Sequence, residues 1–380
     1  MSTLTKPLGK PLAVVLMLLL LAFALSGCAL NESQADSSGS ESEQSQTRTI
    51  VDAVGREVDI PATVERIVPL GNTPRMVVYL GLADKVVGVG GMQRDSITPL
   101  TAYAYATKDA WADLPIVGTD AAGATDYYPE QIISVQPDVI LCTYTAELAD
   151  EIQAKTGIPT IAVPQGTLYQ EDYKQAFRII GEVCGAQDRA EEVISYIDDS
   201  LADLNERTAD FANSDKPSVL GAAATFKGAH GIEGVYVDYP VFSVINADNV
   251  ADDVTVTGDA MAVTVDKEQI LGWNPDIIFL DAGNVNLVKE DLEANQDFYD
   301  KLSAYNSDNF YQYPNSTSYY SNVEIPIANS YYVGSLLYPE QFKDVDVGKK
   351  ASEIFEFFLG DADYLSKLES AGYGYGKVEL

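Results

Sequence analysis

Hydrophobic residues are distributed along this chain in two alternating patterns. Short unbroken apolar runs predict strands of a parallel sheet that is covered on both faces. Between them, apolar residues three and four positions apart predict amphipathic helices. The strands expected in the first half are residues 66–70, 85–89, 115–117, 138–141 and 160–163, with helices at 73–82 and 146–156. The strands expected in the second half are residues 218–222, 276–280 and 310–313, with weaker signals at 254–256 and 262–265. Residues 51–60 predict a hairpin ahead of the first strand.

The middle of the chain is helical without intervening strands. Residues 172–184 predict one helix that ends near Gly185, and residues 188–210 predict a second. Roughly 22 residues give a rod of about 33 Å, long enough to span two domains. The expected fold is therefore α/β, with two lobes of mostly parallel sheet, one long connecting helix and a ligand cleft between the lobes.

A sequence repeat supports the two lobes. Glu-Gln-Ile-Ile begins at Glu130 and Glu-Gln-Ile-Leu begins at Glu268, and each leads after three residues to Pro-Asp and an apolar strand. The Pro-Asp turns begin at Pro137 and Pro275, so both repeats have the same internal spacing. Each repeat predicts a helix, a turn and a buried strand. The alternative is two unrelated units of this common kind.

The first residues have the pattern of an export signal. Lys6 and Lys10 precede an apolar run over residues 12–25, and Leu-Ser-Gly-Cys ends at Cys28. Fourteen residues rise about 21 Å as a helix, short of a bilayer core of about 30 Å. The ending resembles a bacterial lipobox, so we expect removal of residues 1–27 and lipidation of Cys28. An ordinary secretory signal with a chance cysteine is the alternative.

Composition indicates how the chain is divided and which partners are excluded. Residues 31–47 are polar and lack aromatic residues, which predicts a disordered tether. The expected segments are 1–27 signal, 28–47 tether, 48–167 first lobe, 168–212 helical segment and 213–380 second lobe. A formal charge of −33 argues against nucleic acid as a partner.

Few residues are available for catalysis or metal binding. Cys142 and Cys184 are expected to be buried free thiols, with a disulfide as the alternative. His230 is the only histidine, which argues against a zinc site or a histidine-dependent hydrolase. We expect no catalytic residue and no cofactor. An extracellular enzyme and a structural surface lipoprotein remain alternatives of a different class.

Three segments near the start, at residues 49–58, 66–70 and 80–89, carry a family resemblance. In this order they resemble ABC-transporter substrate-binding proteins that capture ferric siderophores, haem or cobalamin. The resemblance implies a lipid-anchored monomer on the extracytoplasmic face of the membrane, with a permease and its ATPase as partners. It also implies that Glu130 and Glu268 dock into arginine pockets of the permease. The alternative is that both are ordinary carboxylates near helix N-termini.

Ligand contacts are expected from loops at the carboxyl ends of the strands. The candidates are Arg75, Met92, Arg94, Tyr144, Lys227, His230, Tyr236, Tyr319, Tyr320 and Asn322. Tyrosine rings stack on planar groups, and Arg and Lys pair with anionic oxygens, so an anionic metal chelate is expected. Many members of the family have Thr-Glu where this chain has Pro74-Arg75. A ferric siderophore is favoured; haem, with His230 as axial ligand and Met92 opposite, and cobalamin remain open.

Overall fold

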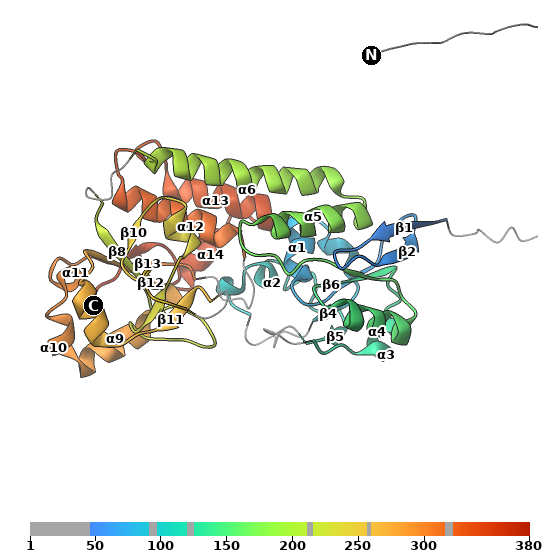
Figure 1. Cartoon of the computed structure of the whole chain (residues 1–380), viewed down its shortest axis with the longest axis horizontal. Coiled ribbons are helices and arrows are strands. Elements are labelled where there is room, and N and C mark those ends of the chain that lie inside the picture. Colours follow the sequence, from blue (N-terminus) through green and yellow to red (C-terminus); the bar gives the residue numbers. More distant parts are fainter. Residues whose placement is uncertain (1–45, 91–96, 120–124, 211–215, 257–259, 316–321) are drawn as a thin grey trace, which may run out of the picture. The chain divides into compact units, whose positions relative to one another are not determined.

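The body of the chain forms two α/β lobes joined by long helices (Figure 1). The computed structural model describes residues 46–90, 97–119, 125–210, 216–256, 260–315 and 322–380. Cys28, Met92, Arg94, Tyr319 and Tyr320 lie outside these residues, as do the expected signal and most of the tether.

The first lobe is built on parallel strands. Its central strands are β3 (Ile67–Pro69), β6 (Val139–Cys142) and β7 (Thr160–Ala162). The short strands β4 (Val89–Gly90) and β5 (Ile116–Gly118) form a parallel pair, and a parallel bridge from Ile67 to Val86 brings the chain before β4 beside β3. The helices of this lobe are α1 (Thr73–Tyr79), α2 (Tyr103–Ala106), α3 (Pro129–Ser134) and α4 (Ala146–Thr156).

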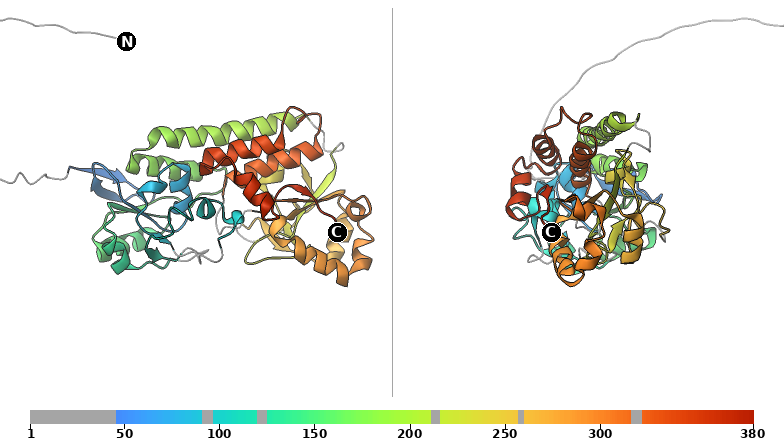
Figure 2. Two further views of the ribbon diagram at one scale, coloured as in Figure 1. Left: turned by 180° about the vertical axis from the view of Figure 1, so that it is seen from behind. Right: turned by 90° about the vertical axis from the view of Figure 1, so that its left-hand side faces the viewer.

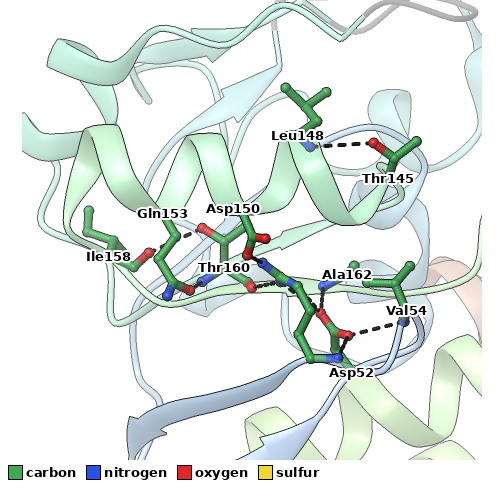
Figure 3. Close-up of polar contacts among 10 residues, drawn as sticks. Asp52, Val54, Thr145, Leu148, Asp150, Gln153, Ile158, Thr160 and Ala162 are labelled. Atoms are coloured by element: carbon green, nitrogen blue, oxygen red, sulfur yellow. Dashed lines mark hydrogen bonds and ion pairs between the residues drawn. The ribbon is translucent and has the colours of Figure 1, made fainter.

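A hairpin ahead of the first lobe is confirmed, with strands β1 (Thr47–Val51) and β2 (Glu57–Pro61), but it begins four residues earlier than predicted. Its turn is fixed to the first lobe (Figure 3). Asp52 is buried and accepts hydrogen bonds from the backbone N–H groups of Val54 and Ala162, at 3.1 and 3.2 Å. Its carboxylate also pairs with Arg56 at 2.7 Å, and Arg56 extends to Asp150 at 2.8 Å. The Asp52 carboxylate therefore links the hairpin to β7, and Arg56 links it to α4.

The second lobe contains a mixed sheet. Its strands are β8 (Ser218–Ala222), β9 (Gly234–Tyr236), β10 (Asp248–Asn249), β11 (Ala262–Thr264), β12 (Ile277–Asp281), β13 (Phe310–Tyr313) and β14 (Gly376–Lys377). The order is β11-β9-β8-β12-β13-β14, with β10 also beside β8. β8, β10, β12 and β13 pair in parallel, and β9, β11 and β14 join antiparallel. Its helices are α7 (Pro240–Ser243), α8 (Lys267–Trp273), α9 (Val285–Ala294), α10 (Gln296–Tyr299) and α11 (Ser303–Asn306).

The two predicted middle helices are confirmed as α5 (Glu171–Cys184) and α6 (Gln187–Thr208). Gly185 ends α5 with φ of 73°, a left-handed conformation that glycine adopts without strain. Figure 2 shows α6 running along one side of the body past both lobes. Arg189 near its start donates to the carbonyl oxygens of Tyr79 in α1 and Phe357 in α13 (Val347–Leu359).

Three further helices close the fold, and the hydrophobic pattern did not predict them. They are α12 (Glu324–Leu337), α13 and α14 (Tyr364–Ser370). Twelve of the 14 residues of α12 are buried, so this helix has no polar face and no periodic pattern to reveal it. α13 packs on α1, and Tyr364 of α14 donates to the carbonyl oxygen of Pro99. The last helices therefore cover part of the first lobe.

Two strand predictions need correction. Most of residues 85–89 is not strand, because a 3-10 turn at Ala83–Lys85 precedes a single bridged residue and the two-residue β4. Residues 254–256 are irregular, because the backbone of Val254 closes a turn onto Ala251. In both places the short apolar run reflects partial burial and not a strand.

The sequence repeat has the same structure in both lobes. α3 and α8 are each followed by a left-handed residue, Gln136 with φ of 45° and Asn274 with φ of 46°. The aspartate two positions later then holds the start of the neighbouring strand. Asp138 accepts from the N–H of Arg66 at 2.9 Å, and Asp276 accepts from the N–H of Ser218 at 2.9 Å. The repeated Pro-Asp thus ties together the first segments of each sheet.

Candidate ligand-binding site

Polar side chains from the two lobes meet in the interior. Arg75 lies on α1, directly after the first strand β3, and only 2% of it is exposed. Its Nη1 donates to Oδ1 of Asn322 at 2.9 Å, and its guanidinium lies 5.1 Å from the ring centroid of Tyr103, a cation–π contact. The structure therefore brings together two of the predicted site residues, one from each half of the chain.

Glu324 lies beside this pair and was not predicted. It is completely buried in the first turn of α12, and Tyr79 of α1 donates to its Oε2 at 2.5 Å. Burial raises the pKa of Glu324 to about 7, although the Tyr79 hydrogen bond and the charge of Arg75 oppose the shift. A carboxylate flanked by Val323 and Ile325 was the sequence signal that could have identified it.

A second buried carboxylate, Asp281, lies at the carboxyl end of β12. Its Oδ2 accepts from the backbone N–H of Thr225 at 2.8 Å and from the hydroxyl of Tyr236 at 2.9 Å. Burial raises the pKa of Asp281 to about 7, and these hydrogen bonds limit the rise. The predicted residue Tyr236 thus bonds to Asp281. Asp281 itself was not predicted from the sequence, and its position at the end of a buried strand was the signal that could have identified it.

Amide side chains fix the loops around Asp281. Oγ1 of Thr225 accepts from Nδ2 of Asn284 at 3.0 Å and from Nδ2 of Asn315 at 2.9 Å. Oδ1 of Asn315 in turn accepts from the N–H of Gly283 at 3.0 Å. The loops that follow β8, β12 and β13 are therefore held together at one edge of the sheet.

The remaining described candidates have separate environments. Tyr144 follows β6 and is buried beside Gly71, where an added Cβ would lie 3.2 Å from its ring. Lys227 is exposed in the loop after β8. In the same loop, the ring of His230 stacks on Phe226 with centroids 4.0 Å apart, and its Nδ1 lies 3.2 Å from the carbonyl oxygen of Ala224. Among the described residues, neither Lys227 nor His230 forms an ion pair with Asp281 or Glu324.

The first lobe also contains an apolar cavity of about 260 Å³ beside β4. Tyr103, Tyr105 and Trp111 line it together with Lys108, whose Nζ lies 3.8 Å from the ring centroid of Tyr105. Tyr103 also contacts Arg75, so the cavity adjoins the buried polar residues. These aromatic residues come from a segment for which the sequence predicted no element.

The repeated glutamates lie at equivalent surface positions. Glu130 is exposed in the first turn of α3, with exposed apolar side chains nearby in sequence at Tyr128 and Ile133. Glu268 is exposed in the first turn of α8, at the edge of a hollow that includes Leu271. The helix dipole stabilises a carboxylate at each of these N-termini, so the positions of the two glutamates do not by themselves require a binding partner.

The prediction for the cysteines is confirmed, since Cys142 and Cys184 are buried free thiols. Burial raises the pKa of each thiol to about 12, so neither is a reactive thiolate at neutral pH.

Two α/β lobes with a long connecting helix, and buried polar residues where the lobes meet, are the architecture expected of a solute-binding protein. The chain belongs to the periplasmic binding protein family, whose model matches residues 71–317. This confirms the class that the sequence resemblance indicated.

Individual relatives agree with this assignment. The chain is 26% identical over 292 residues to YvrC, an uncharacterized ABC transporter substrate-binding lipoprotein of Bacillus subtilis, covering 76% of this chain and 84% of the relative. It is 26% identical over 204 residues to YfiY, a probable siderophore-binding lipoprotein of the same organism, covering 54% and 58%. The solved structure of molybdate-binding MolA from Haemophilus influenzae shares the fold, with a TM-score of 0.61, 21% identity and coverage of 82% and 98%.

No helix in the described part of the chain is long and apolar enough to cross a membrane.

Proposed function

We propose that this chain is the extracytoplasmic binding component of an ABC importer and that it captures a ferric siderophore between its lobes. The observation that carries the proposal is the meeting of buried polar side chains from both lobes, Arg75 with Asn322 and Tyr79 with Glu324. Buried polar groups at a boundary between lobes are typical of a ligand site. Family membership supports a binding function. The description of YfiY as a probable siderophore-binding lipoprotein supports a siderophore as the ligand.

Ligand capture requires the lobes to move around their helical connection. Arg189 ties the start of α6 to α1 and α13, and Arg207 near its end donates to the carbonyl oxygen of Gln341 at 2.7 Å. The helix is therefore anchored at both ends and can serve as a strut. The apolar cavity beside β4 would receive a hydrophobic part of the chelate, and Arg75 would lie at its margin.

Delivery to the membrane completes the proposed role. Lipidation at Cys28 would hold the monomeric protein at the extracytoplasmic face, and residues 28–47 would separate the lobes from the bilayer. Glu130 and Glu268 would dock on the permease, one from each lobe, and the ATPase would drive transport. Their equivalent positions on two copies of the same structural unit support a paired contact.

Haem is the alternative ligand that a specific residue supports. Nδ1 of His230 lies against the carbonyl oxygen of Ala224, which leaves Nε2 as the ring nitrogen that could bind iron. Cobalamin is retained as a further alternative of the same class, and molybdate is the ligand named for MolA.

One titration experiment separates these ligands. Purified protein is titrated with ferric siderophores, haem, cobalamin and molybdate while its tyrosine and tryptophan fluorescence is followed. We expect a ferric siderophore to bind with Kd below about 10 μM, or about −7 kcal/mol. A Soret band that disappears in His230→Ala would identify haem instead. If no ferric siderophore binds in this range, the proposed ligand is wrong.

A further inference from the structure

The buried charged side chains of this protein differ in whether an oppositely charged group lies nearby. In the described ranges, the charged side chains that are buried are Asp52, Arg75, Asp281 and Glu324. Asp52 pairs with Arg56 at 2.7 Å, and the positive charge of Arg75 lies close enough to Glu324 to stabilise its ionised form. Asp281 is different, because no lysine, arginine or histidine that the structure describes lies within ion-pair distance of it.

Tyrosine side chains gather around Asp281. Tyr236 of β9 donates to Oδ2, and its ring stacks on Tyr239 with centroids 3.9 Å apart. Tyr313 of β13 is also near: burial raises the pKa values of Tyr239 and Tyr313, and the negative charge of Asp281 raises both further. Three phenols and the Thr225 backbone thus surround one carboxylate.

Two polar atoms of this group have no hydrogen-bond partner among the described residues. They are Oδ1 of Asp281 and the hydroxyl of Tyr313, and both are fully buried. A buried carboxylate without a positively charged partner costs several kcal/mol, and a positive group that donates a hydrogen bond to Oδ1 would reduce that cost. A protonated amine has three N–H donors and no acceptor, which suits a carboxylate oxygen and phenol oxygens.

A bare metal ion suits the group less well. Phenols bind ferric iron as phenolates, whereas burial here raises the pKa values of all three tyrosines and so retains their protons. The described residues also include no group of three or more His, Cys, Asp and Glu that could hold a metal ion.

We infer that Asp281, with Tyr236, Tyr239 and Tyr313, forms a subsite for a protonated amine of the bound chelate. The inference rests on the proposed function and specifies its ligand: a ferric chelate with a pendant amine, in place of the anionic chelate expected from the sequence. The charge of Arg75 offsets that of Glu324. The carboxylate of Asp281 therefore gives the described interior a net negative charge.

The test uses two ligands that differ only in this amine. Ferrioxamine B has a free ammonium group, and its N-acetyl derivative has the same ferric hydroxamate core without the charge. We expect the purified protein to bind ferrioxamine B at least tenfold more tightly. Asp281→Asn should remove the preference, and Asp253→Asn, an exposed aspartate of the same lobe, should retain it.

A second variant and two further ferric ligands complete the experiment. Tyr313→Phe removes only the unpartnered hydroxyl, and we expect it to reduce the preference even if Asp281→Asn does not fold. Equal affinity for the two ligands, or tighter binding of ferric citrate, would overturn the subsite while the importer assignment stands. A visible phenolate-to-iron band on addition of ferric nitrilotriacetate would show direct metal binding and overturn it too. Failure to bind any ferric chelate would reject the proposed ligand together with the subsite.

Discussion

The guanidinium of Arg75 donates to Oδ1 of Asn322 at 2.9 Å and so joins residues 247 positions apart in the chain. The neighbouring bond from Tyr79 to Glu324 joins the same two elements of structure, α1 and the start of α12. Because both bonds are buried, an opening of the lobes that separates these residues must break or hydrate them.

The first prediction concerns pH. The pKa values of Glu324 and Asp281 are about 7 in the folded protein and are raised from 4.5 and 3.8. The folded state therefore holds more protons than the unfolded state between those values, and ionisation of these groups reduces stability as pH rises toward 7. We expect Tm to fall between pH 5 and pH 8, measured by thermal unfolding. In the double variant Glu324→Gln, Asp281→Asn the fall should be smaller by at least about 4 °C, and an unchanged fall would contradict this assignment.

The second prediction concerns the hairpin anchor in Figure 3. Asp52→Ala removes a buried carboxylate that binds backbone N–H groups and Arg56, and we expect a loss of about 3 kcal/mol in the free energy of unfolding. Asp150 pairs with the same arginine but is 67% exposed, so Asp150→Ala should cost less than about 1 kcal/mol. Urea denaturation measures both, and similar losses in the two variants would show that Asp52 is not the anchor.

The third prediction concerns docking. Glu130→Arg or Glu268→Arg should reduce uptake of the chelate at least tenfold in cells, because each reverses the charge offered to the permease. Affinity of the purified protein should change less than twofold, since both residues are exposed in surface helices.

Matched control variants distinguish the loss of a docking contact from a general effect of reversing a surface charge. Glu147→Arg in α4 and Glu290→Arg in α9 make the same reversal at other exposed positions of each lobe. We expect both to support normal uptake. Equal losses in the control variants, or a loss of ligand affinity in the docking variants, would be inconsistent with the assigned role.

The fourth prediction concerns export. Because Leu-Ser-Gly-Cys ends at Cys28, we expect mass spectrometry of the membrane fraction to show a diacylglyceryl-modified cysteine as the N-terminus. Cys28→Ser should yield protein that is released or that retains residues 1–27. An unmodified cysteine in the wild-type membrane fraction would rule out the anchor.

The sequence predicted those helices and strands that have a clear hydrophobic pattern of their own. The bounds expected for α4, β8 and β13 agree with the structure. α4 is amphipathic and ends just before Gly157, and β8 and β13 are short segments composed mainly of apolar and aromatic residues. The repeat indicated two lobes because its Pro-Asp has the same role in each sheet. In contrast, α12 is buried on nearly every side and has no periodicity.

The site was predicted only in part, for a related reason. Arg75 could be placed because it follows a predicted strand, and Asn322 because it lies in a loop between elements. Tyr236 was expected in a loop, whereas it ends β9, a strand that the sequence did not predict. Asp281 and Glu324 acquire their properties from contacts far along the chain, with Tyr236 and Tyr79, and no local pattern distinguishes them from the many exposed carboxylates. Burial, which raises their pKa values, is a tertiary property.

The return of the last helices to the first lobe affects the order in which the chain can fold. Phe358 of α13 packs on Tyr79 of α1 with ring centroids 5.2 Å apart, and Tyr364 of α14 bonds to Pro99. The first lobe thus lacks part of its outer layer until the final segment of the chain is available. Its sheet can form early, but the lobe is complete only when nearly the whole polypeptide is present. Under the proposed export, that final segment is also the last to cross the membrane.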